Sequence, residues 1–114
     1  MHRGTVRELG DRATATDSLV AGGGKSERAV KVDDDGHIRF PDVTVDLGGR
    51  LEGYINVGRT RKDGLPVRWE WGALNDLAKK GPTYFVPIGN PGYHIPWTPS
   101  GPGRIVPGLP FGWR

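Results

Sequence analysis

Residues 43–57 read VTVDLGGRLEGYINV, two alternating runs separated by a pair of glycines. In the second run Leu51, Ile55 and Val57 share one side, and polar or aromatic residues occupy the other. Successive side chains of a β-strand point to opposite faces, so this period of two indicates two half-buried strands. The stretch therefore predicts a β-hairpin, from which the fold prediction extends in both directions.

The neighbouring segments continue the alternation. Residues 29–32 and 37–40 flank an Asp-Gly turn, and residues 65–71 alternate apolar with charged side chains after a basic loop. We therefore expect residues 29–71 to form a small antiparallel β-meander, sandwich-like or barrel-like. The inward face is predicted to contain Val30, Val32, Ile38, Phe40, Val43, Val45, Leu51, Ile55, Val57, Val67, Trp69 and Trp71.

One short α-helix is predicted over residues 72–80, where good helix formers place Leu74 and Leu77 on one stripe. Pro82 prevents the helix from continuing. Residues 83–88 are expected to return as a strand at the edge of the sheet, because their proline cannot donate to a neighbouring strand. The fold class is thus mainly β with a single helix.

Both ends differ in composition from this β-rich domain, which spans residues 29–88. Residues 1–28 contain a short strand candidate at 5–9 and end in a glycine-rich stretch, which indicates an N-terminal arm and flexible link. Residues 89–114 hold six glycines and six prolines, a density that disfavours helix and regular sheet. We therefore expect extended arms at both ends.

The C-terminal arm keeps aromatic and aliphatic side chains, which disordered spacers tend to lack. We expect these side chains to bind a neighbouring subunit. The predicted partner-binding residues are Tyr93, His94, Trp97, Ile105, Phe111 and Trp113. In the alternative, the tail folds back onto its own domain and the same side chains form intramolecular core.

The 114 residues include 16 basic and 13 acidic ones, for a formal charge of +3. Acids are interleaved with bases, so the charge permits an anionic partner without requiring one. Arg59, Arg61 and Lys62 form a local basic cluster at a loop tip and are candidates for anion contact, although a solvated loop explains them equally well. The chain has no cysteine, which excludes disulfides, thiolate zinc sites and a cysteine nucleophile.

No cofactor or metal is predicted. Residues 19–26 resemble a phosphate-binding loop, but Leu19 stands where that motif needs its first glycine. The acidic turn at 33–36 resembles a calcium loop, but Lys31 stands at its first ligand position. No signal peptide or membrane span is visible, so we expect a soluble protein of a virion or the cytoplasm.

The hypothesis that these features favour is a non-enzymatic structural subunit, such as a head–tail connector, tail or capsid-decorating protein. Its partners would be copies of itself or other subunits, with no membrane and no small-molecule substrate. This rests on an analogy of architecture. One alternative is a small metal-free nuclease toxin domain using Glu70, His94 and an arginine. A second is a small nucleic-acid-binding β-barrel, in which the loop at 58–64 and Tyr54 share an exposed basic face.

Overall fold

The computed structural model describes residues 2–15, 19–24, 26–89 and 92–113, and for Leu19 and Val20 it describes the backbone alone. Residues 1, 16–18 and 25 of the predicted N-terminal arm and link lie outside this part of the chain. Residues 90–91 and 114 of the predicted C-terminal arm also lie outside it.

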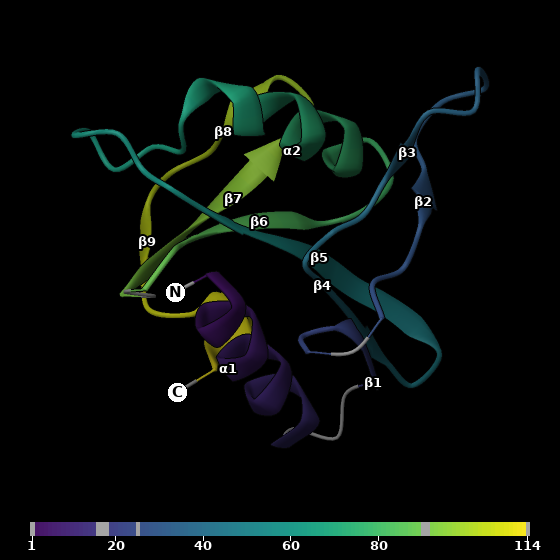
Figure 1. Ribbon diagram of the computed structural model, residues 1–114, viewed down its shortest axis with the longest axis horizontal. Helices are drawn as coiled ribbons and strands as arrows, with labels where there is room; N and C mark the ends of the chain where they lie inside the picture. Colours follow the sequence, from purple (N-terminus) through teal and green to yellow (C-terminus); the bar gives the residue numbers. More distant parts are fainter. Residues whose placement is uncertain (1, 16–18, 25, 90–91, 114) are drawn as a thin grey trace.

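A β-sheet runs through the molecule with one helix on either side (Figure 1). The helices are α1 (His2–Ala15) and α2 (Trp71–Ala78). The strands are β1 (Leu19–Gly22), β2 (Val30–Lys31), β3 (Ile38–Arg39), β4 (Val43–Leu47), β5 (Arg50–Gly58), β6 (Thr83–Pro87), β7 (Tyr93–Thr98), β8 (Gly101–Pro102) and β9 (Val106–Pro107). Two 3₁₀ turns, η1 (Arg68–Glu70) and η2 (Pro110–Gly112), complete the elements. Among the described residues, neither helix has the length and apolar content needed to cross a membrane.

The sheet is mixed. Within the described residues, seven strands are ordered β1-β4-β5-β6-β7-β8, with β9 also pairing with β7, and β2 and β3 form a separate hairpin. The β4–β5 hairpin is antiparallel, as predicted, and sets Val43 opposite Ile55. The mainly β fold class is confirmed.

The antiparallel meander predicted for residues 29–71 ends at β5, because β5 and β6 run parallel and pair from Tyr54↔Thr83 to Gly58↔Pro87. Parallel neighbours need a crossover connection. The predicted helix provides it: α2 lies between these two strands in the chain and covers the sheet (Figure 1). β6 lies inside the sheet rather than at its edge, because β7 pairs with its other side.

The core on the α1 side is formed by alternate residues of the central strands. Val6, Leu9 and Ala13 follow helical spacing and are buried against the sheet. Their buried partners are Val43, Val45, Ile55, Val57, Val86 and Trp113. At about 1.5–3 kcal/mol for each fully buried Val, Leu, Ile or Phe side chain, this face contributes a large part of the stability.

The opposite face of the sheet is covered by α2 and the β2–β3 hairpin. One group of buried side chains consists of Leu74, Phe85, Ile95 and Trp97, and a second of Val30, Val32, Tyr54 and Leu77. The strands are therefore buried on both faces. Tyr54 and Asn56, which the alternation places on the side of the strand opposite Ile55 and Val57, are only 6% and 8% exposed.

The prediction of an N-terminal arm is wrong for the described residues. Residues 5–9, expected as a strand, belong to the 14-residue helix α1. The five residues 5–9 are too short a run to distinguish the period of a strand from that of a helix. The buried apolar positions Val6, Leu9 and Ala13 fit only the helical period. A Glu8–Arg12 ion pair one turn apart adds to the helix.

The strand predicted over residues 65–71 is also wrong. Residues 68–70 form η1 and α2 begins at Trp71. Side chains two residues apart on a helical turn point in nearly opposite directions. Trp71 therefore packs against Trp97, with ring centroids 5.4 Å apart, whereas Trp69 is 75% exposed. Trp69 is therefore not core.

Of the other side chains predicted to face inward, Val30, Val32, Val43, Val45, Ile55 and Val57 are buried, as expected. Leu51 and Val67 are half-buried. Ile38 and Phe40 are exposed, because within the described part of the chain β3 pairs with β2 in a small hairpin separate from the main sheet.

The C-terminal segment is not an extended arm. β7 continues the main sheet and pairs with β6, β8 and β9. Trp97 and Trp113 are 5% and 8% exposed within the chain's own core. Proline removes one donor at each position but leaves the intervening residues free to pair, so this Gly/Pro-rich segment still forms strands.

Candidate functional site

The predicted constellation of Glu70, His94 and an arginine does not form. The ring Nδ1 of His94 lies 2.8 Å from the carbonyl oxygen of Gly108, and the residue is 8% exposed. Its ring also meets the edge of Tyr84, with centroids 5.8 Å apart. His94 therefore holds the C-terminal segment onto the sheet.

Glu70 instead faces a different group of charges. Its carboxylate lies against Gly58 at the end of β5, where an added Cβ would be 3.0 Å from Oε1. Burial raises the pKa of Glu70, the negative charge of Asp42 raises it further, and His2 opposes the shift. The structure thus places Glu70 at the end of β5, where the charges of Asp42 and His2 act on it.

Asp42, in the link between β3 and β4, is the centre of this group. Its Oδ2 accepts a hydrogen bond from the backbone N–H of Val57 at 2.7 Å and lies 3.2 Å from Nε2 of His2. Its own N–H donates to Oδ1 of Asn56, and its carbonyl accepts from the N–H of Gly23. The side chain is 16% exposed and held on several sides.

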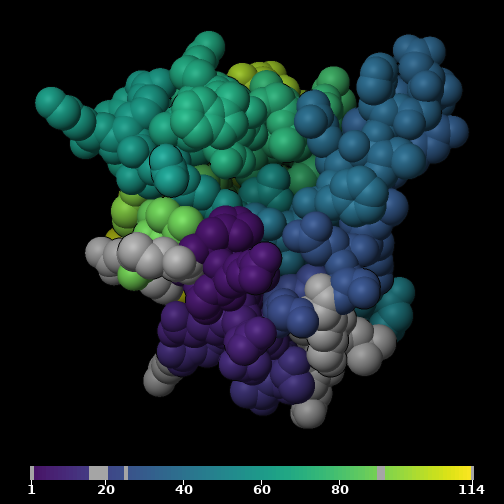
Figure 2. Space-filling model, viewed as in Figure 1, coloured from purple at the N-terminus to yellow at the C-terminus, as the bar shows by residue number. Residues whose placement is uncertain are grey.

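A cavity of about 400 Å³, which we call the α1 pocket, opens beside Asp42 and α1. Its lining is His2, Arg3, Val6, Arg7, Gly22, Gly23, Gly24, Glu27 and Asp42. Figure 2 shows α1, in purple, on the molecular surface, with the blue residues that follow β1 beside it. The volume falls within the range of small-molecule sites, about 300–1,000 Å³.

Close backbone packing forms one wall of the α1 pocket. A Cβ at Gly22, which has φ 73°, would lie 2.0 Å from the carbonyl oxygen of Asp42. A Cβ at Gly10 of α1 would lie 2.6 Å from the carbonyl oxygen of Gly23. The described glycines of the predicted flexible link are therefore packed between α1 and the β3–β4 link.

Asp42 and Glu70 lie at the carboxyl ends of the parallel strands β5 and β6, through their contacts with Val57 and Gly58. Val57 and Gly58 end β5, and the N–H of Ile88, just after β6, donates to the carbonyl of Gly58 at 2.9 Å. The N–H of Gly89 donates to Oγ1 of Thr5, which joins this edge to the first turns of α1. Open sheets with parallel strands usually bind ligands beyond the carboxyl ends of their strands.

Glu27 lies at the exposed rim of the α1 pocket. Loss of surrounding water raises the pKa of Glu27, and the charge of Asp42 and a hydrogen bond with it raise it further. Arg3 and Arg7 line the same cavity. The α1 pocket thus combines the carboxyl groups of Glu27 and Asp42, an imidazole and two guanidinium groups.

The basic cluster of Arg59, Arg61 and Lys62 is exposed, as expected for a loop tip. Arg61 forms an ion pair with Asp63, and its guanidinium lies 5.9 Å from the ring centre of Trp71. The cluster follows directly after β5. Its contact with anions stays a prediction.

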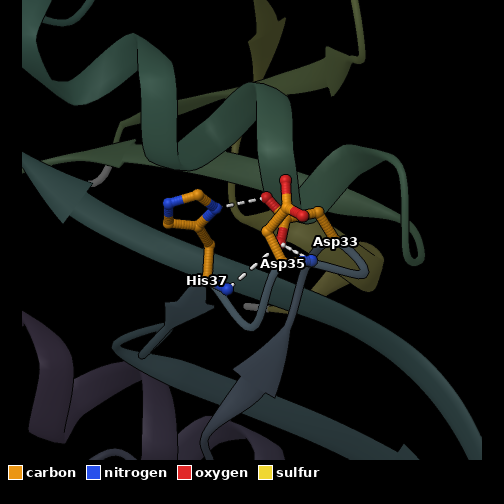
Figure 3. Close-up of side chains that lie close together, drawn as sticks. All are labelled: Asp33, Asp35 and His37. Atoms are coloured by element: carbon orange, nitrogen blue, oxygen red, sulfur yellow. Dashed lines mark hydrogen bonds and ion pairs between the residues drawn. The ribbon is translucent and has the colours of Figure 1, made fainter.

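The acidic turn brings Asp33, Asp35 and His37 together, with one donor atom from each within 4.8 Å of the others (Figure 3). Oδ1 of Asp33 accepts hydrogen bonds from the backbone N–H groups of Asp35 and His37, and Oδ2 pairs with the His37 ring. The hydrogen bond from His37 lowers the pKa of Asp33. These contacts explain the cluster as a hairpin turn stabilised by its own side chains.

The predicted partner-binding residues of the tail mostly contact the chain itself. Tyr93 donates its hydroxyl to the carbonyl of Gly64 at 2.7 Å, and Phe111 packs beside Trp113 with ring centroids 5.0 Å apart. Of the six, only Ile105 has a largely exposed side chain, at 42%. The packing agrees with the alternative in which the tail forms intramolecular core.

Sequence reasoning missed His2, Arg3, Arg7, Glu27 and Asp42. They share no motif spacing, and they come from three segments separated by about a dozen residues or more. The helical period of Val6, Leu9 and Ala13 was the one signal in the sequence, because it would have placed His2, Arg3 and Arg7 on a packed helix.

Comparisons with known proteins gave no match to any family model, curated protein or solved structure. The functional conclusion therefore depends on the chemistry of the α1 pocket.

Proposed function

We propose that this chain cleaves RNA phosphodiester bonds by general acid–base catalysis in the α1 pocket. The observation that carries the proposal is the His2–Asp42 pair, 3.2 Å apart, facing the same cavity as Glu27, Arg3 and Arg7. RNA cleavage through the 2′-hydroxyl needs a base, an acid and cations near the phosphate. The pocket supplies all three kinds of group.

In the proposed reaction, the Glu27 carboxylate removes the proton of a ribose 2′-hydroxyl. The 2′ oxygen forms a bond to phosphorus, the bond from phosphorus to the 5′ oxygen breaks, and protonated His2 gives its proton to the departing oxygen. The products are a 2′,3′-cyclic phosphate and a 5′-hydroxyl. Asp42 orients the imidazole through its hydrogen bond to Nε2.

The electrostatics of the pocket suit these roles. A general base acts most efficiently when its pKa approaches the working pH, and the surroundings raise the pKa of Glu27 in that direction. Arg3 and Arg7 stabilise the negative charge that develops on the phosphoryl oxygens. The proposal takes up the nuclease that the sequence analysis gave as an alternative to a non-enzymatic subunit, but replaces His94 by His2 and assigns the base to Glu27.

The test is incubation of purified protein with a 12-nucleotide RNA and the DNA of the same sequence. We expect RNA fragments ending in 2′,3′-cyclic phosphate and intact DNA. Glu27→Gln and His2→Gln should each slow cleavage by about 10²–10⁴-fold, the usual contribution of a general acid or base. Glu8→Gln, on the exposed side of α1, is the matched control and should cleave normally. Cleavage that is absent in the wild type, or unchanged in both variants, contradicts the proposal.

A structural role within a larger assembly, including a virion component, is a second proposal that one observation favours. Ile38, in β3, and Phe40, directly after it, are 51% and 57% exposed. Exposed apolar side chains of this kind suit contact with another subunit. Light scattering after size-exclusion chromatography should show an oligomer that Phe40→Ser weakens, and a monomer in the wild type contradicts self-association.

A further inference from the structure

Trp69 has the largest exposed fraction among the large apolar side chains of the described residues, at 75%. It sits in η1, which is held rigidly. The N–H of Glu70 donates to the carbonyl of Val67 at 3.0 Å, and the indole N–H of Trp71 donates to the carbonyl of Pro66 at 2.8 Å. The exposed ring therefore projects from an ordered platform.

The loop that precedes η1 is also ordered by its own hydrogen bonds. Thr60 and Pro66 form a β-bridge, and the N–H of Arg61 donates to the carbonyl of Leu65 at 2.7 Å. The N–H of Val67 donates to the carbonyl of Arg59 at 3.1 Å. These contacts hold the basic loop beside the turn that carries Trp69.

Basic residues precede Trp69 in the sequence. Residues 58–69 contain four basic residues and one acidic residue, and the four basic residues Arg59, Arg61, Lys62 and Arg68 are all exposed. The guanidinium groups of Arg61 and Arg68 lie 5.9 Å and 4.1 Å from the ring centre of Trp71, so one basic side chain of the loop and one of η1 meet at the same ring. We call Trp69 with these four residues the Trp69 surface.

We propose that the Trp69 surface binds single-stranded nucleic acid, with a base stacked on the indole and the phosphates near the four cations. Proteins that bind single strands combine aromatic stacking with a basic track for the backbone. A duplex hides the faces of its bases and cannot stack on Trp69. Four basic residues against one acidic residue within residues 58–69 suit the regular negative charge of a nucleic-acid backbone, which favours nucleic acid over a protein partner.

This inference extends the proposed function, from which it takes RNA as the natural ligand. η1 carries Trp69, whose ring is exposed, and Glu70, whose carboxylate lies against Gly58 at the end of β5. A single-stranded RNA stacked on Trp69 would therefore be bound by the turn that follows the loop after β5, the strand whose end contacts Asp42 through Val57.

The experiment measures fluorescence anisotropy with a labelled 12-nucleotide single-stranded DNA, which lacks the 2′-hydroxyl and so cannot undergo the proposed cleavage. We expect Trp69→Ala to weaken binding at least about fivefold, since stacking of one base contributes about 1–3 kcal/mol. Leu47→Ala is the matched control, because Leu47 is also an exposed apolar residue, at 45%. Lys62→Ala should weaken binding and reduce its dependence on salt.

Equal binding by Trp69→Ala and the wild type overturns the inference, as does equal affinity for single strand and duplex. Binding of a polyglutamate peptide as tight as that of DNA also overturns it. Glu27→Gln should bind the DNA normally even where it fails to cleave RNA. A failure of the cleavage proposal and a failure of the Trp69 surface therefore give different results.

Discussion

The backbone N–H of Val57 donates a hydrogen bond to Oδ2 of Asp42, with the two atoms 2.7 Å apart. The same oxygen lies 3.2 Å from Nε2 of His2. One carboxylate thus joins the end of the central strand β5 to the first turn of α1. It holds the fold together at the α1 pocket and orients the proposed general acid.

These two roles of Asp42 can be separated by substitution. Asp42→Ala removes the acceptor of the Val57 N–H in a largely buried position, and should lower the free energy of unfolding by about 1–3 kcal/mol. Asp42→Asn keeps an acceptor oxygen, and should retain most of the stability while losing the charge beside His2. Urea denaturation measures both. Equal stability of the wild type and Asp42→Ala would show that the hydrogen bond contributes nothing.

Two glycines of α1 test how the helix docks. A Cβ at Gly10 would lie 2.6 Å from the carbonyl oxygen of Gly23, whereas a Cβ at Gly4 meets nothing within 4 Å. Gly4→Ala should stabilise the protein by about 0.5–1 kcal/mol, because alanine favours helix. Gly10→Ala gains the same helix propensity but should destabilise the protein overall, because the backbone at Gly23 must move to make room for the added Cβ. Thermal unfolding of the pair checks this, and a stabilised Gly10→Ala would contradict the docking of α1 on the glycine-rich segment.

The two tryptophans Trp97 and Trp69 should respond in opposite ways. Trp97 is 5% exposed and donates its indole N–H to Oδ1 of Asn75 at 2.7 Å, so Trp97→Ala should cost about 3–5 kcal/mol. Trp69→Ala removes an exposed ring and should change stability by about 0.5 kcal/mol or less. Chemical denaturation of both variants is the measurement. A large loss of stability in Trp69→Ala would mean that this ring is packed in solution.

The raised pKa of Glu70 predicts a specific dependence of stability on pH. A carboxyl group whose pKa is higher in the folded state holds its proton there while the unfolded chain releases it. The stability that the protonated Glu70 side chain contributes is therefore lost as the pH rises from its pKa in the unfolded chain through its pKa in the folded protein. Glu70→Gln cannot ionise, so its stability relative to the wild type should increase across that window and then level off.

Denaturation midpoints at pH values from about 3 to 8 test this, with Glu8→Gln as the control for removal of one exposed negative charge. A constant difference in stability between Glu70→Gln and the wild type over the whole pH range would show that burial and the charge of Asp42 do not raise the pKa of Glu70.

Local pattern was enough to predict part of the fold. Alternation around Gly48-Gly49 identified the β4–β5 hairpin, and helix formers ended by Pro82 identified α2. Both depend on interactions between residues close in sequence, so the pattern of the chain carries them. The absence of cysteine likewise excludes disulfide and thiolate chemistry on composition alone.

The tertiary structure alone decided which faces are covered and which residues meet. β5 alternates apolar and polar side chains, yet α1 and α2 cover both of its faces, so Tyr54 is buried as its apolar neighbours are. The lining of the α1 pocket joins His2, Glu27 and Asp42 from three distant segments, which no spacing in the sequence records. Only the parallel crossover of β5 and β6, with α1 docked on Gly23, brings these groups to one edge of the sheet.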